Sequence, residues 1–198
     1  MSGPADVTGE AQCIAATRLW LEKAVIGLNL CPFAKAIHIK DQIRYVVSGA
    51  PTPQALLDDL LRELQWLQSA DPAQTETTLL IHPGVLGDFL DYNDFLDVAD
   101  DAVAELGLAG VIQVASFHPQ YRFEGTGPDD IENYSNRSPY PMLHLLREAS
   151  VERAVTSFPD VATIPEHNIE TLKRLGREGW IRLGLKTAVS RPRNHKNK

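Results

Sequence analysis

The sequence has little cysteine, no excess of basic residues and no long apolar run, and each absence excludes a class of protein. Its 198 residues include only Cys13 and Cys31, too few for the disulfide framework of a small secreted domain. The formal net charge of −7 argues against general nucleic-acid binding, which needs a basic face. No apolar stretch approaches the roughly 20 residues of a membrane span, and residues 1–10 lack the features of a secretory signal. We therefore expect a cytoplasmic protein that binds neither nucleic acid nor a membrane.

The motifs of several common enzyme classes are missing as well. The chain contains no G-x-x-x-x-G-K-[ST] loop, no G-x-G-x-x-G after a strand and no G-x-S-x-G elbow. It also has no C-x-x-C pair. P-loop, Rossmann, serine-hydrolase and thioredoxin chemistry are therefore unsupported. The sequence indicates no cofactor and no particular oligomeric state.

What the chain does contain is the composition of an ordinary globular protein, with 43% hydrophobic and 23% charged residues. At this length we expect one domain over residues 1–189, followed by a basic tail at 190–198. The tail is interpreted as a solvated terminus.

Short apolar segments alternate with amphipathic ones along the chain. The former predict strands at 42–48, 77–82 and 110–117, and the latter predict helices at 9–27, from Pro53 through Leu67, at 93–106 and at 165–175. This order is typical of an α/β fold with crossover connections. We predict a small, mainly parallel three-stranded sheet flanked by five or so helices. The alternative is a ferredoxin-like α+β arrangement, in which one strand pairing becomes antiparallel.

Residues 116–148 form the segment around which the rest is organised. About twenty residues rich in Gly, Pro, Asp and Asn follow the third predicted strand, and a loop of this length inside a domain is commonly functional. Ser138 and Pro139 then predict the start of a further helix, with Ser138 as its N-cap. On that helix His144 and Arg147 would share one face and border a cleft.

Three residues are candidates for catalysis. His118 ends the third predicted strand, where ligands gather in open α/β sheets, and its ordinary pKa suits proton transfer. His144 is either its partner across the cleft or part of a buried hydrogen-bond network. Cys31 is a nucleophile if a cation, a histidine or a helix N-terminus lowers the pKa of its thiol. The alternative for Cys31 is a buried, inert thiol.

A second group of residues suits the binding of an anion. Arg137 and Arg147 would hold a carboxylate or phosphate at the N-terminus of the predicted helix. The side chains of Tyr121, Asn133 and Asn136 would orient the substrate. Alternatively, Arg137 pairs with a nearby carboxylate and fixes the loop; the candidate partners are Asp129, Asp130 and Glu132.

A metal site is a weaker hypothesis. His82, His118 and His144 could converge with a carboxylate such as Asp129, Asp130 or Glu148. The sequence contains no H-x-x-x-H, H-x-H or H-E-x-x-H spacing, so we assign no metal ligand.

Two segments resemble a bacterial family of unknown function that is also seen in plants. They are GLNLCPFA at 27–34 and the stretch SFHPQYRF…NYSNRSPYPMLHLLRE within 116–148, and the similarity covers most of the chain. The resemblance implies that Cys31, His118, Asn136, Arg137, His144 and Arg147 belong to one site. It implies no activity.

These observations lead to one main hypothesis and two alternatives. The main hypothesis is a cytosolic enzyme that acts on a small anionic metabolite by histidine-centred acid–base chemistry. The alternatives are a non-catalytic protein that binds an anionic ligand, and a metal protein that uses the histidines.

Overall fold

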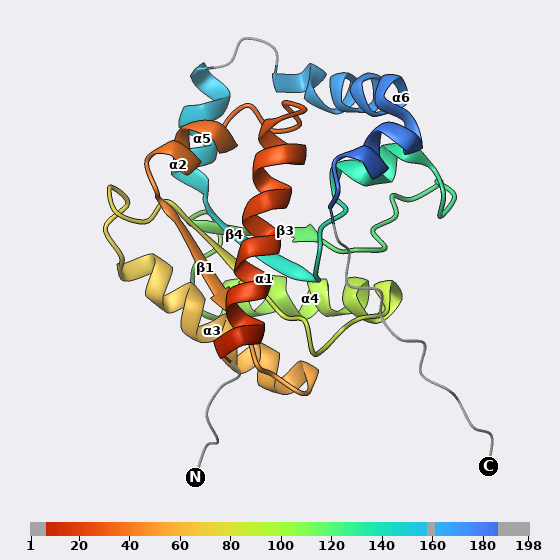
Figure 1. The fold of residues 1–198 in the computed structure, drawn as a ribbon. Coiled ribbons are helices and arrows are strands. Elements are labelled where there is room, and N and C mark those ends of the chain that lie inside the picture. Colours follow the sequence, from red (N-terminus) through yellow and green to blue (C-terminus); the bar gives the residue numbers. More distant parts are fainter. Residues whose placement is uncertain (1–6, 158–160, 186–198) are drawn as a thin grey trace, which may run out of the picture.

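A four-stranded mixed sheet lies between two layers of helices (Figure 1). The structure is a computed structural model that describes residues 7–157 and 161–185. The basic tail predicted at 190–198 lies outside the described residues. None of the helices within the described ranges is both long and apolar enough to cross a bilayer.

The sheet contains the three predicted strands and one more. Strands β1 (Ile43–Val47), β2 (Thr77–Ile81) and β3 (Ile112–Phe117) point in one direction, and β4 (Met142–Arg147) runs opposite to them between β2 and β3. The β1–β2 pairing is parallel and the other two pairings are antiparallel. The predicted α/β class is therefore confirmed, but the sheet is four-stranded and mixed rather than three-stranded and mainly parallel.

Strand β4 replaces the helix that we predicted from Ser138, so that prediction is wrong. Both faces of a central strand are buried, and such a strand has a nearly continuous apolar sequence that periodicity cannot distinguish from a buried helix. The Ser138 side chain does not cap a helix; its hydroxyl donates to the carbonyl of Tyr140. Pro141 favours an extended conformation at Tyr140, which is the signal that the prediction overlooked.

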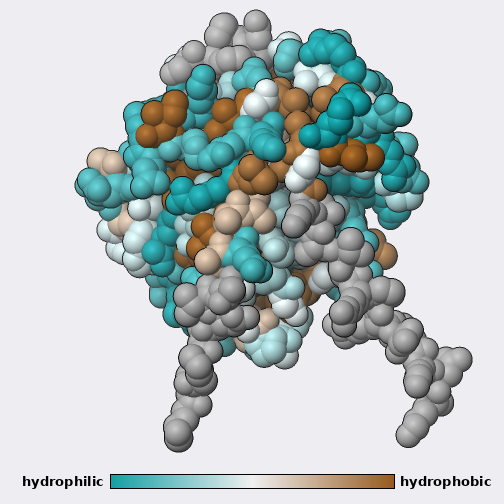
Figure 2. Space-filling view, viewed as in Figure 1, coloured by the Kyte–Doolittle hydropathy of each residue, from teal (hydrophilic) through white to brown (hydrophobic). Residues whose placement is uncertain are grey.

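One face of the sheet is covered by the N-terminal and C-terminal helices. They are α1 (Val7–Trp20), its π-helical continuation η1 (Leu21–Ile26) and α6 (Ile164–Arg182). The predicted helix 9–27 corresponds to α1 and η1 together. The helix predicted at 165–175 continues beyond Gly176, which introduces a kink with φ of 64° instead of ending it. Figure 2 shows apolar side chains in separate patches over the upper part of this view rather than in one continuous band.

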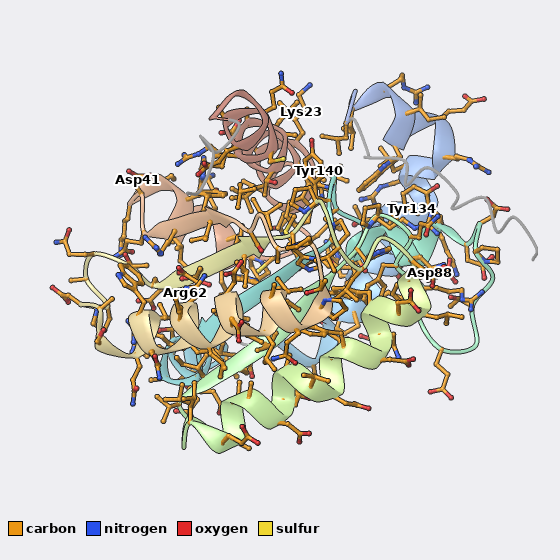
Figure 3. All side chains as sticks on the ribbon, turned by 90° about the horizontal axis from the view of Figure 1, so that it is seen from below. Lys23, Asp41, Arg62, Asp88, Tyr134 and Tyr140 are labelled. Carbon is orange, nitrogen blue, oxygen red and sulfur yellow. The ribbon has the colours of Figure 1, made fainter. Side chains whose placement is uncertain are left out.

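The other face is covered by α3 (Pro53–Ser69) and α4 (Phe89–Glu105), which lie side by side (Figure 3). The predicted N-cap of α3 is confirmed, because Thr52 Oγ1 accepts a hydrogen bond from the backbone N–H of Ala55 at 3.2 Å. Helix α4 begins at Phe89, four residues earlier than predicted, because Asp88 accepts from the N–H of Leu90 and caps the helix there.

Shorter elements complete the fold. Helix α2 (Ala34–Ile39) precedes β1, and α5 (Glu148–Ser157) follows β4 directly. Two 3₁₀ helices, η2 (Ile131–Ser135) and η3 (Val161–Thr163), lie in the loop before β4 and before α6. Trp180 of α6 packs edge-on against Tyr134 of η2, with ring centroids 5.0 Å apart, so the C-terminal helix helps to hold the long loop.

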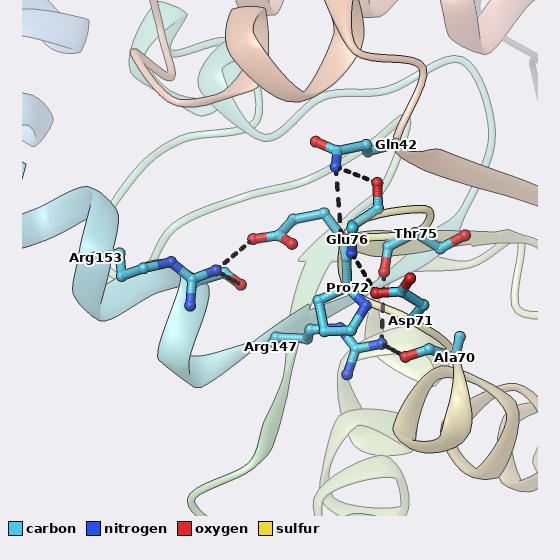
Figure 4. Close-up of polar contacts among 10 residues, drawn as sticks. Gln42, Ala70, Asp71, Pro72, Thr75, Glu76, Arg147 and Arg153 are labelled. Atoms are coloured by element: carbon cyan, nitrogen blue, oxygen red, sulfur yellow. Dashed lines mark hydrogen bonds and ion pairs between the residues drawn. The ribbon is translucent and has the colours of Figure 1, made fainter.

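Arg147 at the end of β4 fixes the C-terminus of α3 (Figure 4). Its Nη2 donates to the carbonyl oxygens of Leu67 and Ala70, at 2.8 Å for Ala70. These are carbonyls of the last turn, which have no partner within a helix. Arg147 therefore joins the end of β4 to the C-terminus of α3 and stabilises the fold there.

We predict that Arg147→Met lowers the free energy of unfolding by about 1.5–3 kcal/mol, since hydrogen bonds to a charged donor are lost while the aliphatic volume is kept. Chemical denaturation monitored by circular dichroism measures this. The exposed Arg182, whose ion pair among the described residues is the i,i+4 pair with Glu178, supplies the matched Arg182→Met control, expected within about 0.5 kcal/mol of the wild type. Equal stability of the two variants would contradict the proposed role of Arg147.

Candidate functional site

His118 is fully buried, and both of its ring nitrogens are hydrogen-bonded to the backbone. Nδ1 accepts from the N–H of Gln120 at 3.0 Å, so Nε2 carries the proton and donates to the carbonyl of Leu86 at 3.2 Å. Leu86 has a φ of 55°, which is uncommon for a residue with a side chain. His118 therefore holds the turn after β2 against the end of β3.

His82 lies in the same buried region, stacked on Tyr92, whose ring also contacts His118. Its Nδ1 bonds the carbonyl of Val85 at 3.1 Å. Burial lowers the pKa of both His82 and His118 to about 4, since an imidazolium is poorly solvated there. Both rings are neutral at pH 7, and neither faces an open hollow.

The polar residues of the long loop mainly bind the loop itself. The fully buried Asn133 accepts from the N–H of Phe123 and donates to the carbonyl of Gly127. Asn136 donates to the carbonyl of Ser116 at 3.2 Å. The ring of Tyr121 packs on Phe89 and Phe123. Loop closure explains these three side chains without a ligand.

Arg137 also contacts the loop. It donates to the carbonyls of Tyr121 and Pro128 and lies over the ring of Tyr134, 4.3 Å from its centroid. It bonds these carbonyls instead of the carboxylates considered above; Asp129, for example, pairs with Arg177. Arg137 also lines an open surface hollow of about 400 Å³, together with Arg122 and Asp88. That hollow contains neither Arg147 nor His118, so the three residues on which the predicted site depended do not meet.

A different place in the fold forms a partly open, mainly apolar cavity of about 280 Å³, which we call the sheet cavity. Its floor is the sheet face under η1 and α2, and its walls include Leu21, Val25 and Ile37. The π-helical geometry of η1 supplies two of these walls, and π-helical turns are often found at functional sites. Gly27 ends η1 where a Cβ would collide with the carbonyl oxygen of Lys23.

His144 lies in the middle of that floor, paired with Leu79 on one side and Ala115 on the other. Its Nε2 is 2.7 Å from Thr77 Oγ1. The Thr77 hydroxyl donates its proton to the carbonyl of Leu145 at 2.6 Å, so it accepts from Nε2–H of His144. The lone pair of Nδ1 is left without a partner among the described residues. Burial lowers the pKa of His144 to about 4, so the ring is neutral at pH 7.

Cys31 lines the same cavity and is half-buried. It lies in the turn after η1, where its N–H bonds the carbonyl of Val25 at 3.4 Å. The structure thus brings two of the three catalytic candidates, Cys31 and His144, to one hollow. His118 lies apart from them.

The histidines considered for a metal site do not converge. His144 faces the sheet cavity, whereas His82 and His118 contact Tyr92 of α4 on the other side of the sheet. Across residues 7–157 and 161–185, no group of three or more His, Cys, Asp or Glu side chains is placed to hold a metal ion.

Sequence reasoning did not identify the residues that complete the cavity. Thr77, Ala115 and Phe117 line it from β2 and β3. Strand pairing aligns them with alternate residues of β4, so the period-2 pattern that links them to His144 is visible only when 142–147 is recognised as a strand.

The fold and the cavity define a mixed α/β protein with a mainly apolar hollow of about 280 Å³ against its sheet. The chain belongs to a family described as a protein of unknown function (DUF1415), whose model matches residues 12–182. No curated protein and no solved structure matches the chain.

The buried histidines give a pH dependence of stability. In the unfolded chain a histidine has a pKa near 6.5, whereas His82 and His118 in the folded protein have pKa values of about 4. Between these values the unfolded state binds more protons. We therefore predict that stability falls as the pH is lowered from 6.5 towards 4, by up to about 1.4 kcal/mol per pH unit for each histidine.

Urea denaturation at several pH values, for the wild type and His118→Asn, measures this. Asn retains an acceptor for the N–H of Gln120 but cannot be protonated. The variant should be less stable at pH 7 and should show a shallower fall between pH 6.5 and 4. A fall as steep as that of the wild type would contradict a neutral, buried His118.

Proposed function

We propose that this protein binds a small molecule in the sheet cavity, with the apolar part of the ligand against η1 and the sheet and a hydrogen-bond donor of the ligand on Nδ1 of His144. One observation carries the proposal, namely the open nitrogen of a neutral histidine on the floor of an apolar hollow. Small-molecule sites commonly combine a mainly apolar lining with a few placed polar groups.

The volume of the cavity, about 280 Å³, bears on the size of the ligand. At slightly below the usual range of ligand pockets, the volume favours a small ligand.

The hydrogen bond from His144 to Thr77 supports binding in a fixed orientation. It leaves the imidazole in one tautomer, with an acceptor available to a bound molecule. Since no described carboxylate hydrogen-bonds the ring, an imidazolium would gain little stabilisation. The geometry therefore favours an acceptor role for His144 over proton abstraction.

We predict that the wild-type protein binds N-phenyl-1-naphthylamine, an uncharged dye that brightens in apolar surroundings, and that Ala115→Leu weakens this binding by about tenfold. The added side chain would occupy the floor beside His144. Fluorescence titration gives the dissociation constants. Ala104→Leu, on the exposed side of α4, is the matched control and should bind as the wild type does.

Circular dichroism would show whether Ala115→Leu is folded. Because Trp20 lines the cavity, quenching of tryptophan emission by the dye gives a second measurement on the wild type alone. Absence of saturable dye binding to the wild type would overturn the proposal. So would undiminished binding by a folded Ala115→Leu.

A second candidate function is an enzyme in which His144 transfers a proton to or from a bound anionic metabolite. The observation that favours it is that His144 and Cys31 line one cavity. We predict that wild-type protein incubated with a small-metabolite extract changes the amount of at least one metabolite, as followed by mass spectrometry. His144→Gln should abolish that change while still binding the dye, and an extract that stays unchanged with the wild type would count against the enzyme.

A further inference from the structure

The sheet cavity borders a second hollow at the surface, which we call the mouth. The mouth has a volume of about 420 Å³ and shares Ile37 and Glu76 with the cavity, so the two adjoin where α2 meets the start of β2. Arg153 of α5 closes part of this boundary, with its Nη2 3.0 Å from Glu76 Oε1 (Figure 4). Ile37, Glu76 and the Glu76–Arg153 pair thus lie between the cavity and the surface.

The wall of the mouth is held in place by backbone contacts. The side-chain N–H of Gln42 donates to the carbonyl of Ala73 at 2.8 Å. The backbone carbonyl of Gln42 accepts from the N–H of Glu76 at 2.9 Å. These bonds fix the segment before β2 against the start of β1. The charged side chains around the mouth therefore project from a defined frame.

The charges at the mouth favour an anion. Two cations, Lys40 and Arg153, line it against one carboxylate, Glu76. This local excess of positive charge occurs on a protein whose net charge is −7. The side chain of Glu76 is only 14% exposed and that of Arg153 is 64% exposed, so the guanidinium is the accessible member of the pair.

The floor of the cavity is mainly apolar along the strands. It can be described in rows, each made of residues that are paired across neighbouring strands. Ile43, Thr77 and Leu146 form the row nearest the mouth, and the next row contains His144. Phe117 lies one row further, where Trp20 packs on it edge-on at 5.2 Å. From the first row to the third the sheet extends about 13 Å. An elongated apolar body fits this course, with one polar end at the mouth.

We infer that the two hollows join beside Glu76 and that the ligand of this site is an amphipathic anion, whose apolar body lies over His144 and whose charged head meets Lys40 and Arg153 at the mouth. This inference rests on the proposed function, since it requires the cavity to bind a ligand. It retains the anionic ligand expected from the sequence but assigns its recognition to cations other than Arg137 and Arg147.

The test is displacement of N-phenyl-1-naphthylamine by three molecules with the same eight-carbon chain and different heads. They are octanoate, 1-octanol and octylamine, compared at pH 7.5 and low ionic strength. Octanoate should displace the dye at the lowest concentration. Its advantage over 1-octanol should shrink as salt is added, because surface electrostatic interactions are screened.

Variants at the mouth separate charge recognition from a general effect on the fold. Arg153→Gln and Lys40→Gln should each weaken the binding of octanoate by about two- to fivefold and leave the binding of 1-octanol unchanged, as expected for partly exposed charge pairs. Glu76→Gln should strengthen the binding of octanoate, because it removes a negative charge from the mouth. The matched control is Arg62→Gln on α3 (Figure 3), because Arg62 is 67% exposed and pairs with Asp59, which is 19% exposed, away from the mouth.

The outcomes are distinguishable. If 1-octanol displaces the dye as well as octanoate does, or if octylamine is best, the anionic head is overturned while ligand binding by the cavity stands. If Arg62→Gln weakens octanoate as much as Arg153→Gln does, recognition at the mouth is overturned. If the dye itself fails to bind the wild type, the proposed function fails first.

Discussion

Strand β4 is hydrogen-bonded to β2 on one side and to β3 on the other, and helices cover both of its faces. Each of its side chains therefore has to be accommodated away from water. Leu143 and Leu145 meet this constraint by packing with α3 and α4, and Met142 packs on the opposite face. His144 and Arg147 are the polar members of the strand, and each is bonded to a partner on a neighbouring element.

The two polar residues of β4 satisfy the same constraint in different ways. Arg147 uses its guanidinium on the carbonyls that end α3, which joins the strand to a helix on one side of the sheet. His144 uses one nitrogen on Thr77 and keeps the other for the cavity on the opposite side. Successive side chains of a strand alternate between faces, yet both residues line the sheet cavity, His144 from its floor and Arg147 from the end of β4.

The sequence was informative wherever a single helix or strand had its own signal. Helix α3 was predicted from its leucine spacing and its Thr52 cap, and the three strands that end before His or Ser were found within one or two residues. Strand β4 was not found, because its sequence MLHLLR lacks a polar–apolar alternation and follows Ser138-Pro139, a pair typical of a helix N-terminus. Its misassignment gave His144 and Arg147 one face of a helix, whereas in the structure both residues line the sheet cavity from a strand.

The candidate residues of the long loop were misleading for a different reason. Asn, Arg and His are the residues of binding sites, and they are also the residues that satisfy backbone groups in a loop of irregular structure. Asn133 and His118 are fully buried and bond the backbone, and a single sequence does not distinguish that use from recognition of a ligand. Cys31 and His144 line one hollow, and His118 does not.

The π-helical turn of η1 links the length of the N-terminal segment to the shape of the cavity. A π-helical turn contains one residue more than an α-helical turn, and here the extra residue lies between α1 and the fixed point at Gly27. Removing one residue from Leu21–Ile26 would restore α-helical geometry but rotate α1 by about 100° relative to that point. Trp20 would then leave the wall of the cavity. Insertions and deletions in this stretch are consequently constrained by the hollow it encloses, whereas the same changes in an exposed loop would leave that hollow intact.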